Sequence, residues 1–269
     1  MSKIYYECSD CFDFMDKMLK YKFQPNIILT SPPYNTGKKG TKESSRDNYD
    51  ARYDIHLDVM TATEYRDWCV KIFHKFNDIL AKDGVVLWQV SYGTNISGNQ
   101  DSIGLMWNVL SDIIDKTNFT IADRIVWKKH NALPNNTSSN KLTRITEDIY
   151  VFCRKLEFQT FNANKGIAST NERTKQKFYN NIFNFIEAKN NDGACKLNKA
   201  TYSSELCEKL LSIYAEEGSK VYDPFMGTGT TGIACYKMGL DCYGSELSEA
   251  QVEYSKQRLE KLKKELGDE

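Results

Sequence analysis

The sequence predicts an α/β protein built on a mostly parallel, doubly wound sheet. Short runs such as 27–30 and 85–90 consist almost wholly of apolar or β-branched residues, as in strands that are buried on both faces. Amphipathic helical segments separate these runs along the chain, and that alternation is typical of parallel sheets. A glycine-containing turn at 223–231 leads from a strand into a helix, and such turns bind ligands at the strand ends of these sheets.

Composition places the chain among ordinary globular proteins. Its 269 residues are 41% hydrophobic and 27% charged, enough for one large domain or one domain with an insertion. The formal net charge is zero, so any contact with nucleic acid must come from local basic patches. No run approaches the ~18 apolar residues that span a bilayer, and 1–7 lacks a signal-peptide core. We therefore expect a cytoplasmic protein without membrane contact.

The eight cysteines do not predict a metal site. Only Cys8 and Cys11 have a spacing that resembles metal ligands, and no second pair or nearby histidine completes a site. We interpret all eight as reduced thiols and expect no metal.

The first third of the chain contains the most unusual motif. A strand at 4–7 precedes an amphipathic segment that ends at Leu19, with Asp10 as a helix N-cap or a ligand-binding acid. The strand 27–30 then ends in Ser31-Pro32-Pro33-Tyr34, where neither proline can donate a ladder hydrogen bond. The Ser31 hydroxyl and the Pro32 carbonyl can accept hydrogen bonds from an amine on a flat group, and Tyr34 offers a stacking face. A plain Pro-Pro turn is the alternative interpretation.

The middle of the chain alternates between regular elements and basic loops. Residues 36–52 lack apolar periodicity and are basic, which predicts a mobile loop. A capping box at 61–64 begins a helix to Leu80, and strands or helices follow at 85–90, 103–115, 123–127 and 149–153. A second basic loop occupies 128–144.

Residues 155–198 lose the alternation of strand and helix. This segment mixes lysine and arginine with phenylalanine and tyrosine, which favours either a nucleic-acid contact module or a small satellite core. Helical periodicity returns at 203–214.

The last part of the chain predicts a nucleoside site. The strand that ends at Asp223 is followed by Pro224-Phe225-Met226-Gly227-Thr228-Gly229, a helix at 230–238, a strand at 241–244 and then Glu246. Two glycines allow the backbone to approach a ligand, and a carboxylate at the end of the next strand binds both hydroxyls of a ribose. The turn lacks the third glycine of a dinucleotide site and the Gly-Lys-Ser/Thr of a triphosphate site. A nucleoside without a pyrophosphate fits better, and S-adenosyl-L-methionine is the obvious candidate.

The two motifs together resemble the signature motifs of the amino-group DNA methyltransferases that modify N(4) of cytosine or N(6) of adenine. Their order, with Ser31-Pro32-Pro33-Tyr34 first and 223–231 last, is that of the permuted β group, and 127–134 and 147–152 are similar to further segments of that group. The resemblance implies a circularly permuted, Rossmann-like S-adenosylmethionine-dependent methyltransferase fold. One departure is 198–203, where the family often has a His-Pro-rich segment.

The resemblance also implies roles for individual residues. Ser31, Pro32, Pro33 and Tyr34 would be catalytic. The cofactor would be bound by Asp10, Asp223, Pro224, Phe225, Gly227, Thr228, Gly229, Thr230 and Glu246. Residues 1–154 would form the catalytic half, 155–198 a target-recognition insertion, and 199–269 the cofactor half.

The implied activity is transfer of a methyl group to the exocyclic amine of a base flipped out of double-stranded DNA. Serine before Pro-Pro favours N(4) of cytosine, with N(6) of adenine as the alternative. More distant alternatives are methylation of RNA or of a protein amide, and a non-catalytic nucleic-acid-binding subunit. The missing third glycine disfavours a dehydrogenase. We expect a monomer or homodimer, with a cognate restriction endonuclease as a further partner. DNA contacts are predicted at Lys38, Lys39, Lys128, Lys129, Arg144 and Arg173.

Overall fold

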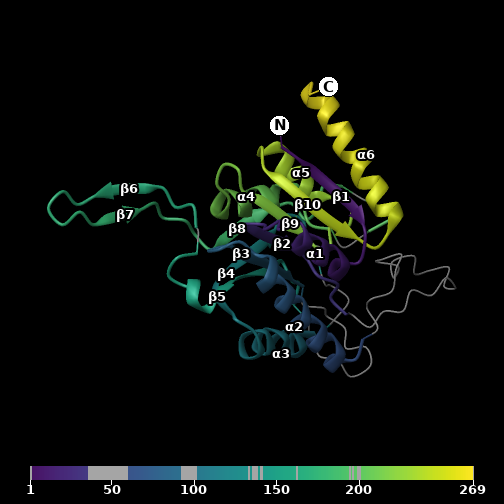
Figure 1. Cartoon of the computed structure of the whole chain (residues 1–269), viewed down its shortest axis with the longest axis horizontal. Coiled ribbons are helices and arrows are strands. Elements are labelled where there is room, and N and C mark those ends of the chain that lie inside the picture. The colour runs from purple at the N-terminus through teal and green to yellow at the C-terminus, as the bar shows by residue number, and fades with distance from the viewer. Residues whose placement is uncertain are drawn as a thin grey trace.

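A central sheet organises the computed structural model (Figure 1). The structure describes residues 2–35, 60–91, 102–132, 134, 139, 142–161, 163–193, 195, 197–198 and 201–268. Within them the sheet has eight strands in the order β1-β10-β9-β2-β3-β5-β4-β8. These strands are β1 (Ile4–Cys8), β2 (Ile27–Thr30), β3 (Val85–Val90), β4 (Phe119–Lys129), β5 (Thr146–Arg154), β8 (Phe185–Ala188), β9 (Lys220–Asp223) and β10 (Asp241–Glu246).

Among the eight described strands of this sheet, β5 alone runs antiparallel to the others. A helix carries the chain across the sheet between β2 and β3 and between β3 and β4, so these strands stay parallel. Between β4 and β5 the described residues contain no helix, and those two strands pair antiparallel. The mostly parallel, doubly wound sheet expected from the sequence is therefore confirmed.

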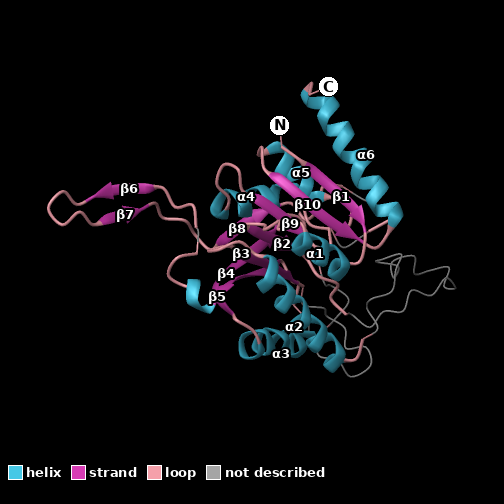
Figure 2. Ribbon diagram, viewed as in Figure 1, coloured by secondary structure: helices cyan, strands magenta, loops and turns pink. Residues whose placement is uncertain are grey.

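Helices cover both faces of the sheet (Figure 2). The first face carries α1 (Cys11–Lys20), α2 (Ala62–Ile79) and α3 (Ser102–Lys116). The second face carries α4 (Ser204–Tyr214) and α5 (Thr230–Lys237), while α6 (Glu249–Leu266) packs beside α5 against β1. Alternate residues of β2 enter the two cores: Ile28 joins the first, and Ile27 and Leu29 join the second. This two-sided burial explains why β2 is apolar throughout.

Local signals in the sequence set the helix ends. The Thr61 hydroxyl accepts from the Glu64 amide, and the Glu64 carboxylate accepts from the Thr61 amide, so the predicted capping box begins α2. The Asp10 carboxylate caps α1 by accepting from the Phe12 amide at 2.8 Å. Gly239, with φ of +71°, follows α5 at the predicted stop.

Residues 155–198 contain both a protruding hairpin and part of the main sheet. After the short 3-10 helix η1 (Lys155–Glu157), β6 (Ile167–Thr170) and β7 (Lys177–Tyr179) form a two-stranded ribbon in which every residue is exposed. A satellite core would bury side chains, so β6 and β7 do not form one. The strand β8 pairs with β4, so this part of the predicted insertion belongs to the central sheet.

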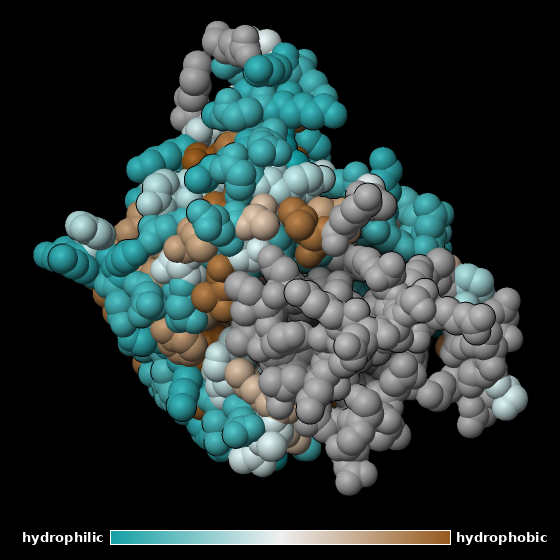
Figure 3. Space-filling view, turned by 90° about the vertical axis from the view of Figure 1, so that its right-hand side faces the viewer, coloured by the Kyte–Doolittle hydropathy of each residue, from teal (hydrophilic) through white to brown (hydrophobic). Residues whose placement is uncertain are grey.

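The hairpin projects from the amino-terminal end of the parallel strands (Figure 1). Its base lies at that end, because the Asn164 amide donates to the Ile213 carbonyl and the Thr160 hydroxyl donates to Asp83, which precedes β3. The turns that follow β1, β2, β9 and β10 lie at the opposite end. Figure 3 shows the side of the molecule on the right of Figure 1, where hydrophobic atoms are exposed among hydrophilic ones.

Candidate active site

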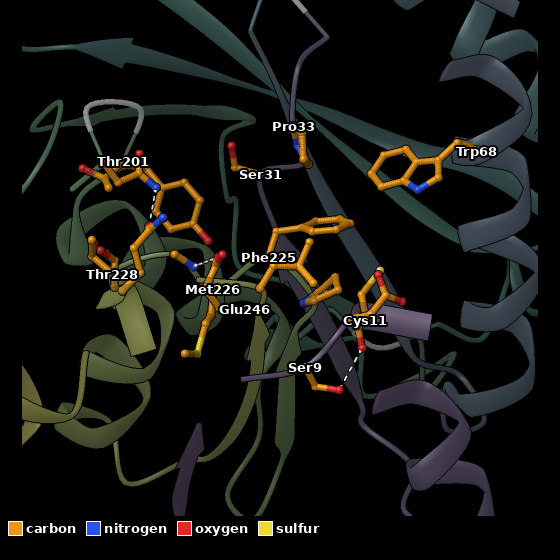
Figure 4. Close-up of a pocket in the computed structure, with 18 residues that line it drawn as sticks. Ser9, Cys11, Ser31, Pro33, Trp68, Thr201, Phe225, Met226, Thr228 and Glu246 are labelled. Atoms are coloured by element: carbon orange, nitrogen blue, oxygen red, sulfur yellow. Dashed lines mark hydrogen bonds between the residues drawn. The ribbon is translucent and has the colours of Figure 1, made fainter. Parts of the chain in front are cut away.

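A pocket opens where the winding of the sheet reverses, between β2 and β9. The chain leaves β2 through α2 on one face and leaves β9 through α5 on the other, so the turns after these strands diverge and leave a crevice. Eighteen residues line the pocket (Figure 4). They are Ser9, Asp10, Cys11, Ser31, Pro33, Trp68, Asn198, Thr201, Tyr202, Pro224, Phe225, Met226, Gly227, Thr228, Thr230, Glu246, Leu247 and Gln251.

Both predicted motifs reach this pocket, although they lie far apart in the sequence. Ser31 and Pro33 line one side, while Phe225 and Glu246 lie across from them (Figure 4). Pro32 is buried and Tyr34 is half-buried, and neither lines the pocket. The strand pairing of β2 with β9 explains the meeting, because it places Ser31 and Pro224 after neighbouring strand ends.

Hydrogen bonds fix the backbone of the Ser-Pro-Pro-Tyr loop. The Tyr65 hydroxyl, from α2, donates to the Pro33 carbonyl at 2.7 Å. The Asn35 amide group donates to the Met60 carbonyl at 2.8 Å, and its oxygen accepts from the Met60 amide at 3.0 Å. The loop is therefore attached to the start of α2, and the two prolines add their own stiffness.

The side chains of this loop join a polar network. The Ser31 hydroxyl is hydrogen-bonded to the Tyr34 hydroxyl, which donates to the amide oxygen of Gln89 on β3. Gln89 in turn donates to Glu147 on β5 at 2.7 Å. This network holds Ser31 at the pocket wall.

The glycine turn after β9 is shaped to receive a ligand beside a carboxylate. Gly227 and Gly229 have φ of +50° and +77°, a region that side chains with a Cβ adopt rarely. The Gly227 amide donates to Glu246 Oε2 at 3.0 Å, and the Ser248 amide donates to Oε1 at 3.0 Å. These bonds hold the carboxylate at the pocket.

Asp223 does not line the pocket, although the sequence predicted it to bind the cofactor. The residue is 1% exposed, and its carboxylate accepts four hydrogen bonds within the described residues. The donors are the Thr30 and Thr231 hydroxyls at 2.7 and 2.6 Å, the Tyr202 hydroxyl at 3.0 Å and the Phe225 amide at 3.1 Å. Burial raises the pKa of Asp223, and these donors act against that rise. Asp223 therefore joins the two motifs from beneath the pocket.

The other predicted cofactor residues divide between the pocket and its support. Asp10, Pro224, Phe225, Gly227, Thr228, Thr230 and Glu246 all line it. Gly229 lies behind them, where an added Cβ would stand 2.7 Å from Ser255 Cβ. The Asp10 carboxylate caps α1, and the residue also lines the pocket, so the two interpretations of this residue are compatible.

The predicted DNA contacts do not gather at one place. Lys128 and Lys129, at the end of β4, form ion pairs with Glu187 and Glu147, and Arg144 is exposed just before β5. These three residues lie at the pocket end of the sheet. Arg173 is on the β6–β7 hairpin at the opposite end, and Lys38 and Lys39 lie outside the described residues.

Several pocket residues were missed by sequence reasoning. Trp68 stacks against Tyr65 with ring centroids 5.8 Å apart and meets the Phe225 ring at 5.5 Å. In the sequence it looks like one more core residue on the apolar face of α2. Asn198 donates to Gln251 at 3.0 Å beside Gly227, and it lies in the segment that departs from the family pattern.

The described residues contain no group of three or more histidines, cysteines or acids that could hold a metal ion. Among the helices that the structure describes, none is both long and apolar enough to cross a membrane.

The fold and the pocket define a doubly wound α/β domain with a nucleoside-type site at its switch point. Comparison with known proteins identifies the family: the N6/N4 methyltransferase model, described as DNA methylase, matches residues 26–257. The chain belongs to this DNA methylase family.

Individual proteins resemble the chain over most of its length. The type II methyltransferase M.BglII of Bacillus subtilis is 22% identical over 249 residues, which cover 87% of the chain and 63% of that protein. The structure of the PvuII DNA methyltransferase, described as cytosine-N4-specific, superposes with a TM-score of 0.65 at 18% identity over 95% of this chain and 86% of that one. The M1.HpyAVI–SAM complex gives 0.58 at 19% identity over 96% and 98%. These two solved structures share the fold of the chain. The chain spans less than two thirds of the length of M.BglII.

Proposed function

We propose that the protein transfers a methyl group from S-adenosyl-L-methionine to the exocyclic amine of a base flipped out of double-stranded DNA. One observation carries the proposal: the Ser31 hydroxyl and the Glu246 carboxylate line the same pocket. An acceptor for an amine thus faces a carboxylate of the kind that binds a ribose. Membership of the DNA methylase family supports the same reaction.

The pocket residues fit the methyl donor. Glu246 would accept hydrogen bonds from the ribose hydroxyls, and Phe225 and Asp10 would bound the adenine. Thr228, Thr230, Asn198 and Thr201 offer polar groups for the amino-acid end. When bound, the cofactor supplies an electrophilic methyl on a sulfonium. M1.HpyAVI, which shares the fold, was crystallised with SAM.

Ser31 would act on the target amine, whose lone pair is delocalised into the base. Hydrogen bonds from its two N–H groups to the Ser31 hydroxyl and the Pro32 carbonyl favour a pyramidal nitrogen with its lone pair on the methyl side. The nitrogen then bonds the methyl carbon as the carbon–sulfur bond breaks, S-adenosylhomocysteine leaves, and the amine loses one proton to solvent. Alignment of the reacting atoms within the pocket can contribute several kcal/mol.

The base must leave the duplex to reach this site, and the Tyr34 ring is the proposed stacking surface. We place the DNA backbone along the pocket end of the sheet, over Lys128, Lys129 and Arg144, with Lys38 and Lys39 as further contacts. Within 155–198, β8 remains the candidate for target recognition. The hairpin with Arg173 points away from the pocket end of the sheet. A cytoplasmic location and a cognate restriction endonuclease stay predictions.

N(4) of cytosine is the proposed target, and N(6) of adenine is the alternative. Serine at position 31 favours cytosine, and the PvuII enzyme, which shares the fold, is described as cytosine-N4-specific.

The test is mass spectrometry of nucleosides from DNA incubated with the protein and a cofactor labelled in its methyl group. We expect label in N(4)-methylcytosine. Label only in N(6)-methyladenine would overturn the target base, and DNA without label, on any sequence tried, would overturn the reaction.

A further inference from the structure

A serine hydroxyl can donate or accept a hydrogen bond, so the proposed role of Ser31 requires a fixed direction. If its proton pointed toward the target amine, it would compete for the lone pair that must attack the methyl group. A carboxylate has no such ambiguity, because it only accepts. The neighbourhood of Ser31 contains an arrangement that removes the ambiguity.

Gln89, which is 2% exposed, determines which group donates in each hydrogen bond between it and Ser31. Its amide nitrogen donates to Glu147 Oε2 at 2.7 Å and to the Val90 carbonyl at 3.1 Å. A carboxylate and a carbonyl only accept, so the NH2 group must face them and the Gln89 oxygen must face Tyr34.

Tyr34 passes this direction on to Ser31. The single hydroxyl proton of Tyr34 is donated to the Gln89 oxygen. In the hydrogen bond between Ser31 and Tyr34, the proton therefore belongs to Ser31. The lone pairs of Ser31 Oγ remain at the pocket wall, where an incoming amine can donate to them.

Glu147 is itself held in place. Its Oε1 accepts from the Ser91 hydroxyl at 2.9 Å and forms an ion pair with Lys129. The Lys129 ammonium lies 5.0 Å from the centre of the Trp127 ring, which adds a cation–π contact. Three strands, β3, β4 and β5, thus fix the far end of the chain of hydrogen bonds.

We propose that Gln89 and Glu147 are positioning residues that orient the Tyr34 and Ser31 hydroxyls and make Ser31 a hydrogen-bond acceptor for the target amine. The proposal rests on the proposed function, and it assigns to two residues outside both signature motifs a role in methyl transfer. This partly buried chain of hydrogen bonds makes the uncharged serine an acceptor toward the pocket, as a carboxylate would be.

The first test is the single-turnover rate constant of Gln89→Leu with saturating DNA and cofactor. Leucine has similar volume but cannot accept from Tyr34, so both hydroxyls lose their fixed direction. We expect the rate constant to fall about tenfold to a hundredfold, with cofactor and DNA affinities within about twofold of the parent. The matched control is Gln176→Leu, on the exposed hairpin turn, which should leave all three quantities unchanged.

Two further variants separate orientation from a general loss of structure. In Gln89→Glu combined with Glu147→Gln, the amide and the carboxylate exchange places, so that residue 89 still accepts from Tyr34 and now also accepts from residue 147. This pair should recover at least about tenfold of the rate lost in Gln89→Leu. In a Ser31→Ala background, Gln89→Leu should cost little more, because the hydroxyl that it orients is gone.

The outcomes distinguish this proposal from the one on which it rests. A parent protein that labels no DNA contradicts the proposed function itself. An active parent with Gln89→Leu at the parent rate would overturn the orienting role alone. An exchanged pair as slow as Gln89→Leu, with a parent-like melting temperature, would overturn it too.

Discussion

Asp223 offers the most direct test of how the two motifs are held together. Its buried carboxylate accepts from Thr30, Thr231, Tyr202 and the Phe225 amide. Asp223→Ala removes all four acceptor contacts. The Tyr202 and Thr231 hydroxyls, 2.7 Å apart, can still bond to each other. The Thr30 hydroxyl and the Phe225 amide lose a partner.

The expected cost follows from these two groups. Each buried donor left without a partner costs about 1–3 kcal/mol, so Asp223→Ala should lower the free energy of unfolding by roughly 3–5 kcal/mol once the small cavity is included. Asp223→Asn keeps an oxygen for Thr30 and Phe225, and its NH2 group can donate to Tyr202 and Thr231 after their hydroxyls rotate. We expect a cost of only about 1–2 kcal/mol.

Urea denaturation followed by circular dichroism measures both free energies. The matched control is Asp241→Ala, because within the described residues Asp241, at the start of β10, accepts only from the Lys3 amide; it should cost less than about 1 kcal/mol. A loss below about 1 kcal/mol for Asp223→Ala, or equal losses for the alanine and asparagine variants, would refute the assignment of Asp223 as the bridge.

Three other perturbations test the site. Glu246→Ala should weaken cofactor binding in calorimetry by roughly tenfold to a hundredfold, since a charged hydrogen bond is worth about 1.5–3 kcal/mol; unchanged affinity would contradict the ribose role. Arg144→Ala should flatten the salt dependence of DNA binding by about one unit, whereas Arg173→Ala should leave it unchanged, and the reverse result would move the DNA path to the hairpin. Because burial raises the pKa of Asp223, the native state binds its proton more tightly than the unfolded chain does. Its contribution to stability is therefore largest below the unfolded value of about 3.9 and decreases as the pH rises through the native pKa. The stability advantage of the parent over Asp223→Asn should accordingly shrink from pH 4 to pH 7, and a growing advantage would contradict the sign.

The sequence predicted the elements that local patterns determine. The apolar strands, the capping box of α2 and the glycine turn after β9 all depend on neighbours in the chain, and each forms as expected. The family motifs also indicated which loops meet. Pairing across the sheet was beyond such patterns: β5 runs antiparallel, and β8, in the middle of a segment without periodicity, joins the sheet edge.

Roles that depend on distant partners could not be predicted. Trp68 has the spacing of a core residue, and only the position of Phe225 after β9 makes it a wall of the pocket. Arg173 has the composition of a DNA contact, but the path of the chain after β5 carries it to the wrong end of the sheet for the pocket. In the sequence, Gln89 is a polar residue inside an apolar strand. Its hydrogen bonds to Tyr34 and Glu147, on which the proposed positioning role depends, can be recognised only in the folded structure.

The bridge at Asp223 also explains why the order of the two motifs along the chain does not matter to the site. Thr30 is the last residue of β2 and Asp223 is the last residue of β9, and they are 193 positions apart in the sequence. Their 2.7 Å hydrogen bond joins the strand ends directly before Ser31 and directly before Pro224. The geometry of the pocket is therefore set by the pairing of β2 with β9 and by this buried bond, rather than by a covalent connection between the halves. A chain that begins with the cofactor half or with the catalytic half reaches the same arrangement, provided that these two strands pair and an acid ends β9.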